Sequence, residues 1–215
     1  MSGLVKDNIF GSSGSIIEAA GGLSWQPVVT ASTVTVSAAK GYFINTTSNT
    51  GIGIGALDTL TSGNNNTAIG KNAGTAFTSA ARNTAIGTNA LTTSSTNGDN
   101  TAVGRQSLKS CTGDGNTALG KDAGEGITSG VNNIAIGRNS ADNLSTGSGN
   151  VIIGADIDAA ANNSARTLKI AGNDGSTTTT WISGDSSANV VIGGTVTEYG
   201  GASLTTTGKA LVMGF

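Results

Sequence analysis

The sequence contains no histidine, and among its 215 residues it has one cysteine, Cys111, and one proline, Pro27. Without histidine the chain cannot form a Ser-His-Asp triad, a histidine general base or a histidine metal ligand. A single cysteine excludes a disulfide within the chain and a thiolate zinc cluster. We therefore expect no enzyme active site of these kinds, no bound metal and no cofactor.

Charge and aromatic residues are also scarce, at 11% and 4%, and the net charge is only −2. A chain this close to neutral has no electrostatic basis for binding nucleic acid. No apolar run reaches 18 residues, so no membrane insertion is expected. The first ten residues lack the apolar run of a secretory signal, so we expect none. Low charge and a single proline also argue against a typical disordered chain.

What the sequence does contain is a repeat. A five-residue unit of the form Asn-Thr-Ala-Ile-Gly recurs seven times, and the asparagines are 17 residues apart, except for one interval of 16. The asparagines are Asn49, Asn66, Asn83, Asn100, Asn116, Asn133 and Asn150. A fixed repeat of this length is typical of a solenoid, in which each unit buries its apolar surface against the next.

The residue types indicate how one unit folds. The residues between Asn and Gly favour an extended strand, whose alternation places Thr67 and Ile69 on one face and Ala68 on the other. We expect the aliphatic residue to fill a narrow interior and the alanine to allow close approach of another wall. The glycine permits a corner with positive φ, and stacked asparagines can form a side-chain ladder. The expected repeat core is Ile52, Ile69, Ile86, Val103, Leu119, Ile136 and Ile153. The expected corners are Gly53, Gly70, Gly87, Gly104, Gly120, Gly137 and Gly154.

These patterns predict an all-β fold, a parallel β-solenoid or β-roll of about seven 17-residue coils. We expect a small β-rich N-terminal attachment region over residues 1–47, the solenoid over 48–165, and a β-rich cap or tip over 166–215. Within the first region, 1–24 is expected to be an arm that docks on a partner, with a disordered terminus as the alternative, and 25–47 is expected to form two strands. The cap is expected because the last coil of a solenoid otherwise leaves an open strand edge.

The Asn-Thr-Ala-Ile-Gly units over residues 49–154 resemble the head repeats of trimeric autotransporter adhesins and the same repeats in bacteriophage tail-fibre proteins. The resemblance implies a parallel β-roll in which three chains pack around one axis, with no catalytic residues. It implies a rigid column that presents binding sites, and three weak sites on one trimer gain avidity.

The ends of the chain favour the phage member of this pair. A surface autotransporter needs a signal peptide and a membrane anchor, whereas a virion protein assembles in the host cytoplasm and needs neither. We therefore expect a homotrimeric tail fibre, attached to other virion proteins through residues 1–47 and contributing to attachment to a host surface glycan or protein. Three alternatives stay open: a capsid fibre or decoration protein, a bacterial trimeric surface adhesin, and a glycan-depolymerising fibre enzyme.

One further set of residues is a candidate ligand site. Lys71, Arg105, Lys121 and Arg138 all follow a motif glycine, so in-phase coils would align them in a basic stripe. Such a stripe could bind an anionic glycan or lipopolysaccharide. The alternative is a solvated face balanced by nearby acids such as Asp99, Asp114 and Asp122. Cys111 lies between repeat units, where we expect it to be inert.

Overall fold

The computed structural model describes residues 48–194 without a gap, and five two-residue strands outside that range. The chain forms two units, Met1–Ser32 and Thr33–Phe215. In the first unit, β1 (Phe10–Gly11) pairs antiparallel with β2 (Gly14–Ser15). The rest of the expected docking arm, most of the strands expected over 25–47, and the last residues of the expected cap, 205–215, lie outside the described residues.

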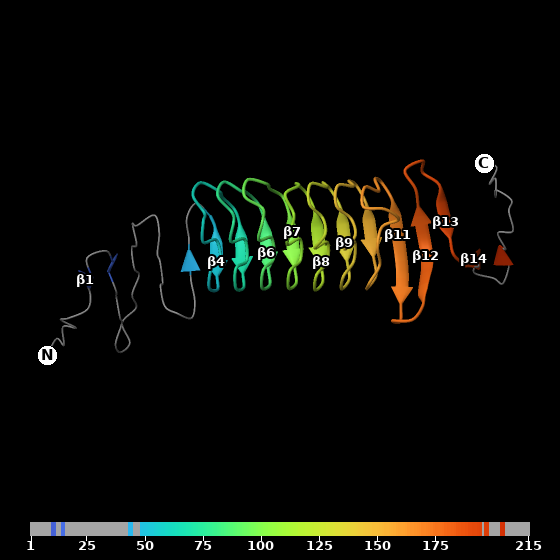
Figure 1. Cartoon of the computed structure of the whole chain (residues 1–215), viewed down its shortest axis with the longest axis horizontal. Coiled ribbons are helices and arrows are strands. Elements are labelled where there is room, and N and C mark those ends of the chain that lie inside the picture. The colour runs from blue at the N-terminus through green and yellow to red at the C-terminus, as the bar shows by residue number, and fades with distance from the viewer. Residues whose placement is uncertain are drawn as a thin grey trace. The chain divides into compact units, whose positions relative to one another are not determined.

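The second unit is built on one sheet of eleven strands that follow one another in chain order from β3 to β13 (Figure 1). A separate antiparallel pair, β14 (Val196–Thr197) and β15 (Ser203–Leu204), follows it. The strands of the sheet are β3 (Phe43–Ile44), β4 (Thr50–Ile52), β5 (Thr67–Ile69), β6 (Thr84–Ile86), β7 (Thr101–Val103), β8 (Thr117–Leu119), β9 (Ile134–Ile136), β10 (Val151–Ile153), β11 (Leu168–Asn173), β12 (Thr178–Gly184) and β13 (Val190–Ile192).

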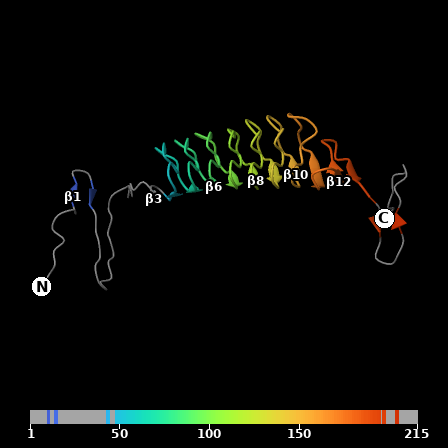
Figure 2. The same ribbon diagram turned by 60° about the horizontal axis from the view of Figure 1, so that its bottom comes forward.

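Strands β4 to β11 are all parallel, and equivalent residues of successive repeats lie opposite one another. Ile69, for example, pairs with Ile52 on one side and Ile86 on the other. The strands form one side of the solenoid and the loops form the other (Figure 2). The predicted all-β parallel solenoid of about seven 17-residue coils is therefore confirmed.

Antiparallel strands close both ends of the parallel stack. β3 pairs antiparallel with β4, and β12 and β13 follow β11 as antiparallel neighbours. β11 belongs to the segment expected to be the cap, yet it still pairs in parallel with β10. The regular coil therefore extends one strand beyond residue 165 before the chain reverses.

One coil is a residue shorter than the others, but the sheet register does not change. Asn116 follows Asn100 by 16 residues, and Val103 still lies opposite Leu119. The Nδ2 of Asn100 bonds the carbonyl of Gly113, 13 residues on, whereas the Nδ2 of Asn66 bonds the carbonyl of Ala80, 14 residues on. The missing residue therefore belongs to the loop side, between Cys111 and Gly113.

The motif glycines form corners where neighbouring coils come closest. Gly87 has a φ of 133°, a value that residues with a side chain rarely adopt. A Cβ at Gly87 would lie 2.3 Å from the carbonyl oxygen of Gly104 in the next coil. The other six motif glycines have φ values between 126° and 141°. The predicted glycine corners are confirmed, and they serve close stacking as well as the turn.

The motif asparagines form the expected ladder, and all seven are almost completely buried. The backbone N–H of Asn83 donates to Oδ1 of Asn66 at 3.0 Å, and its Nδ2 donates to the carbonyl of Asn97 across its own coil at 2.8 Å. The same backbone bond recurs at every coil from Asn66 to Asn150. Buried polar groups need such partners, so the ladder fixes each loop to the strand side of its coil.

Candidate functional site

The strand side of the solenoid presents an exposed aliphatic row that runs through every coil. Ile52, Ile69 and Leu119 are 46%, 36% and 50% exposed, and the other members of the expected repeat core are half-buried. The prediction that these residues fill the interior was wrong. The alanines between them point inward instead, and Ala68 and Ala85 are completely buried. We call Ile52, Ile69, Ile86, Val103, Leu119, Ile136 and Ile153 the isoleucine row.

The reason for this reversal lies on the other walls of the coil, which carry large buried side chains. Leu57, Phe77, Leu91, Leu108, Ile127, Leu144 and Ile157 are at most 1% exposed. They already occupy the narrow interior, so only a small side chain fits opposite them on the strand. Sequence reasoning missed these residues. The available signal was a large apolar residue either eight or eleven positions after each of the first six motif asparagines; after the seventh, Asn150, it lies seven positions on.

These two interior positions compensate each other in volume. Where the eighth position is glycine, the eleventh is large, as with Gly74 and Phe77: a Cβ on Gly74 would lie 2.9 Å from the Phe77 ring. Where the eighth position is leucine, the eleventh can be small, as with Leu91 and Ser94. Leu91 adopts a φ of 50°, in the left-handed region that glycine adopts at the same point. In these two coils the pair fills the interior in opposite ways, whereas the first coil has leucine at both positions.

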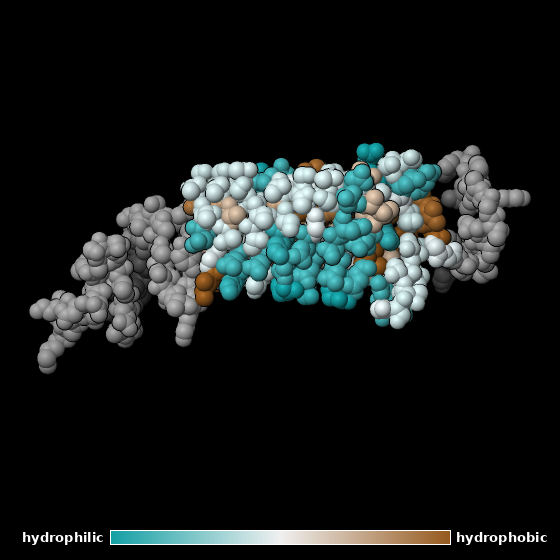
Figure 3. All heavy atoms as spheres, viewed as in Figure 1, coloured by the Kyte–Doolittle hydropathy of each residue, from teal (hydrophilic) through white to brown (hydrophobic). Residues whose placement is uncertain are grey.

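The candidate basic stripe does stack in phase, but three of its four members are held in ion pairs. The N–H of Asp122 donates to the carbonyl of Arg105 at 2.8 Å, which places successive members one coil apart. Arg105 and Lys121 both pair with the Asp122 carboxylate, at 3.0 and 2.8 Å, and Arg138 pairs with Asp156. Among the four predicted residues, only Lys71 has no ion pair within the described residues. The stripe is therefore an internally balanced face, as the alternative interpretation expected. Figure 3 shows polar residues gathered in a band along the coils.

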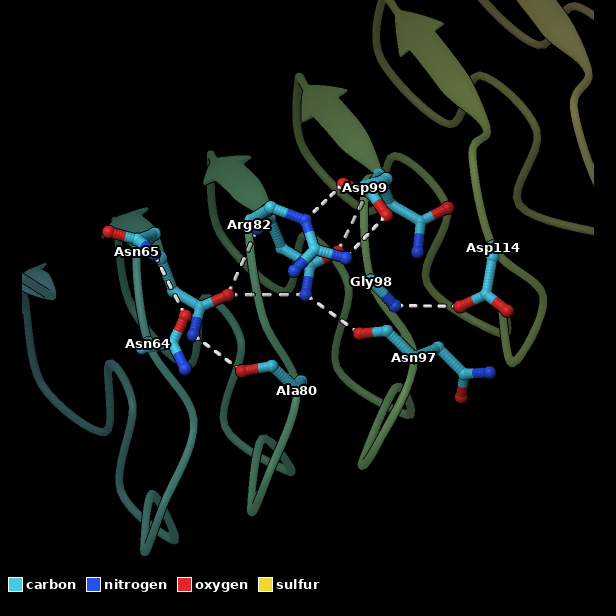
Figure 4. A network of polar contacts seen from close by, with 11 residues as sticks. Asn64, Asn65, Ala80, Arg82, Asn97, Gly98, Asp99 and Asp114 are labelled. Atoms are coloured by element: carbon cyan, nitrogen blue, oxygen red, sulfur yellow. Dashed lines mark hydrogen bonds and ion pairs between the residues drawn. The ribbon is translucent and has the colours of Figure 1, made fainter.

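A second polar network lies near the corners that precede Asn83 and Asn100 (Figure 4). Arg82 donates from Nε and Nη2 to the two oxygens of Asp99, one coil on, at 2.6 and 2.8 Å. Asp114 accepts the N–H of Gly98 at 2.7 Å. The hydrogen bond from Arg82 lowers the pKa of Asp99. Both partners are more than half exposed, so this pair links neighbouring coils with little effect on stability.

Acidic side chains gather on the loop side near Asp142. Burial raises the pKa of Asp142, and the negative charges of Asp158, Glu125 and Asp122 raise it further. In the part of the chain that the structure describes, no three His, Cys, Asp or Glu side chains are grouped so as to hold a metal ion. The same part contains no helix that could cross a membrane.

Cys111 lies in the interior, where its thiol donates to the carbonyl of Gly113 and accepts from Nδ2 of Asn116. Burial raises the pKa of Cys111 to about 11, so the reactive thiolate is scarce at neutral pH. The environment agrees with the expectation that this cysteine is inert.

The fold and its surfaces thus define an all-β parallel solenoid with an aliphatic row along its strand side and an internally paired polar face. Comparisons with protein-family models, with curated proteins and with solved structures find no match to the chain.

Proposed function

We propose that this chain is a structural virion protein, a homotrimeric bacteriophage tail fibre that assembles in the host cytoplasm, projects from the particle and contributes to host-cell attachment. The observation that carries the proposal is the isoleucine row. Soluble monomers rarely expose a long continuous apolar surface, and such a surface usually marks an interface. Here it runs through all seven coils on one side.

The shape of the row favours like copies as its partners. Each strand of β4 to β10 is three residues long. Each coil therefore presents two side chains on its outward face: the member of the isoleucine row at the third strand position and the residue at the first strand position. Rows this narrow, from three parallel chains, can converge on one axis, which is the closed cyclic arrangement that homo-oligomers prefer. The alanines, which were expected to allow close approach of another wall, point inward, so the residues available for contact between chains are the aliphatic ones.

The remaining features support a mechanical role. The buried asparagine ladder bonds each coil to the next, and the glycine corners bring neighbouring coils into close contact, so both hold the coils in a fixed stack along the axis. A stiff trimer can hold three binding sites for a surface glycan or protein at one distance from the particle. Residues 1–47 would join it to other virion proteins.

The oligomeric state is tested by analytical ultracentrifugation of the full chain. We expect a mass three times the 20.9 kDa of the monomer. A monomer at every concentration would contradict the trimer. Ile86→Asp and Ile136→Asp should each dissociate the trimer, whereas Thr61→Asp on the loop side is a control that should not.

The position on the particle is tested by gold-labelled antibody against the chain on purified virions. We expect label on tail projections. Label on the head indicates the capsid fibre alternative, and label on the bacterial surface without phage indicates an adhesin. A fall in the viscosity of host polysaccharide on incubation with the pure protein would indicate the depolymerase instead.

A further inference from the structure

The outward face of the sheet changes character along the chain. Next to the isoleucine row runs a second outward row, formed by the first residue of each strand. It is threonine in all five strands from β4 to β8, and it becomes Ile134, Val151 and Leu168 in β9, β10 and β11. The first five coils therefore present one aliphatic row, and the following strands present two.

The doubled aliphatic surface continues into the antiparallel strands. Ile170 lies opposite Ile182, which lies opposite Ile192, so the isoleucine row continues across both pairings. Opposed residues of neighbouring strands share a face. Ile192 is 47% exposed, and Val190, the equivalent of Leu168 two strands on, is 63% exposed. Figure 3 shows hydrophobic residues gathered at this end, over β13.

Trp181 adds to the same patch. It is the extra residue at the bulge in β12, and a Cβ on Gly172 would lie 2.7 Å from its ring. The ring therefore lies over the outward face of β11, where it stays 52% exposed. Large half-exposed aromatic residues beside aliphatic ones are typical of the centre of an interface. We call Ile134, Val151, Leu168, Trp181, Val190 and Ile192 the C-terminal patch.

We propose that copies of this chain associate first and most tightly through the C-terminal patch, and that the threonine-bearing coils from β4 to β8 close afterwards. The inference rests on the proposed homotrimer and states where its interface is strongest. Its physical basis is that an aliphatic side chain leaves water without losing a hydrogen bond, whereas a buried threonine hydroxyl must find a new partner.

A second copy fits this patch better than an unrelated partner. The patch is continuous with the isoleucine row and contains no charged side chain. Its residues Ile134, Val151 and Leu168 lie one coil apart, so the same residues of a second copy have the same spacing and can pack against them in register. Once three chains meet there in register, the equivalent rows of the remaining coils are already aligned, so closing them becomes an intramolecular step.

Two full-length triple variants test the proposal. Ile134→Thr, Val151→Thr and Leu168→Thr together convert the C-terminal patch to the chemistry of the first five coils. The matched control, Ile52→Thr, Ile69→Thr and Ile86→Thr, makes the same exchange in the N-terminal coils. All six residues face outward, so circular dichroism should show that both variants keep the solenoid.

The readout is the protein concentration at which half of the trimer dissociates. We expect the C-terminal variant to raise it by about a hundredfold and the control by less than about tenfold. Equal effects, or a larger effect of the control, overturn this proposal and leave the trimer standing. A wild-type chain that is monomeric at every concentration overturns the trimer itself.

Trp181 gives an independent signal once Trp25→Phe has removed the other tryptophan. Its emission should shift to the blue as the wild-type protein is concentrated through the dissociation range. If the emission is blue at every concentration, including where the protein is monomeric, the patch is covered by the protein's own residues 195–215 and the proposal is wrong.

Discussion

Thr167 donates two hydrogen bonds to Oδ1 of Asn150, one from its backbone N–H at 3.0 Å and one from its hydroxyl at 2.7 Å. Thr167 stands where an eighth motif asparagine would fall, 17 residues after the seventh. The last acceptor of the asparagine ladder is therefore satisfied by a residue that cannot extend the ladder. The asparagine ladder therefore ends at Thr167, although the sheet continues through β11, β12 and β13.

The ladder predicts a large loss of stability when one of its members is removed. Asn100→Ala leaves the buried N–H of Asn116 without its acceptor, and it removes the amide donor from the carbonyl of Gly113, which keeps only the thiol of Cys111. Losing one hydrogen bond outright and replacing another by a weak thiol donor should lower the free energy of unfolding by about 2–3 kcal/mol. Denaturant titration measures it. The control is Asn97→Ala in the preceding loop, whose side chain makes no hydrogen bond within the described residues and should change little. Equal effects would contradict the role of the ladder.

The glycine corners predict a difference between two glycines that both have positive φ. Gly87→Ala adds a Cβ 2.3 Å from a carbonyl oxygen of the next coil and should lower the free energy of unfolding by about 3–5 kcal/mol. Gly175, in the turn after β11, has a φ of 96° and nothing within 4 Å of an added Cβ. Gly175→Ala should therefore lower it by only about 1 kcal/mol. Thermal melts of the two variants measure this difference. If Gly87→Ala and Gly175→Ala lose similar amounts of stability, the close contact between coils contributes nothing at the corner.

The paired interior positions predict that two damaging substitutions rescue each other. Gly74→Leu alone meets the Phe77 ring, and Phe77→Ser alone leaves a void that should lower the free energy of unfolding by about 3–5 kcal/mol. Together they reproduce the Leu91 and Ser94 pair of the next coil. The double variant should be more stable than either single one, with a coupling of about 2 kcal/mol or more in a double-mutant cycle. Simple additivity would refute compensation.

Cys111 predicts a slow reaction with thiol reagents. With its pKa raised to about 11, about one thousandth of the thiol is ionised at pH 8, and the side chain is fully buried. Labelling with a chromogenic disulfide should be slow in the native protein and complete within minutes in guanidinium chloride. The Cys111→Ser variant gives the background. Rapid native labelling would show that the interior opens at this coil.

The sequence was sufficient for the backbone of the solenoid. The 17-residue period, the glycine after each strand and the asparagine before it specify strands, register, corners and ladder, because each depends on residue type at a fixed phase. The facing of the strands was not predictable in the same way. Alternation separates Ala68 from Ile69, but which of the two points inward depends on the volume that Phe77 and its equivalents contribute from the other walls.

The candidate site was predicted less well for a similar reason. The alignment of Arg105, Lys121 and Arg138 follows from the period, whereas their neutralisation depends on Asp122 and Asp156, which lie in the next coil or next in sequence. Pairing of this kind requires the three-dimensional offset between side chains. The widening of the outward aliphatic surface from β9 onward is visible in the sequence once the facing is known.

The short coil between Asn100 and Asn116 has a consequence for how this protein can change. A residue is missing from one loop, and the sheet beside it keeps its register unaltered. The length of a loop can thus change without changing the register of the strands in the sheet. Mutation can therefore change the loops that the molecule presents to its surroundings, one coil at a time, while the sheet that supports them is inherited intact.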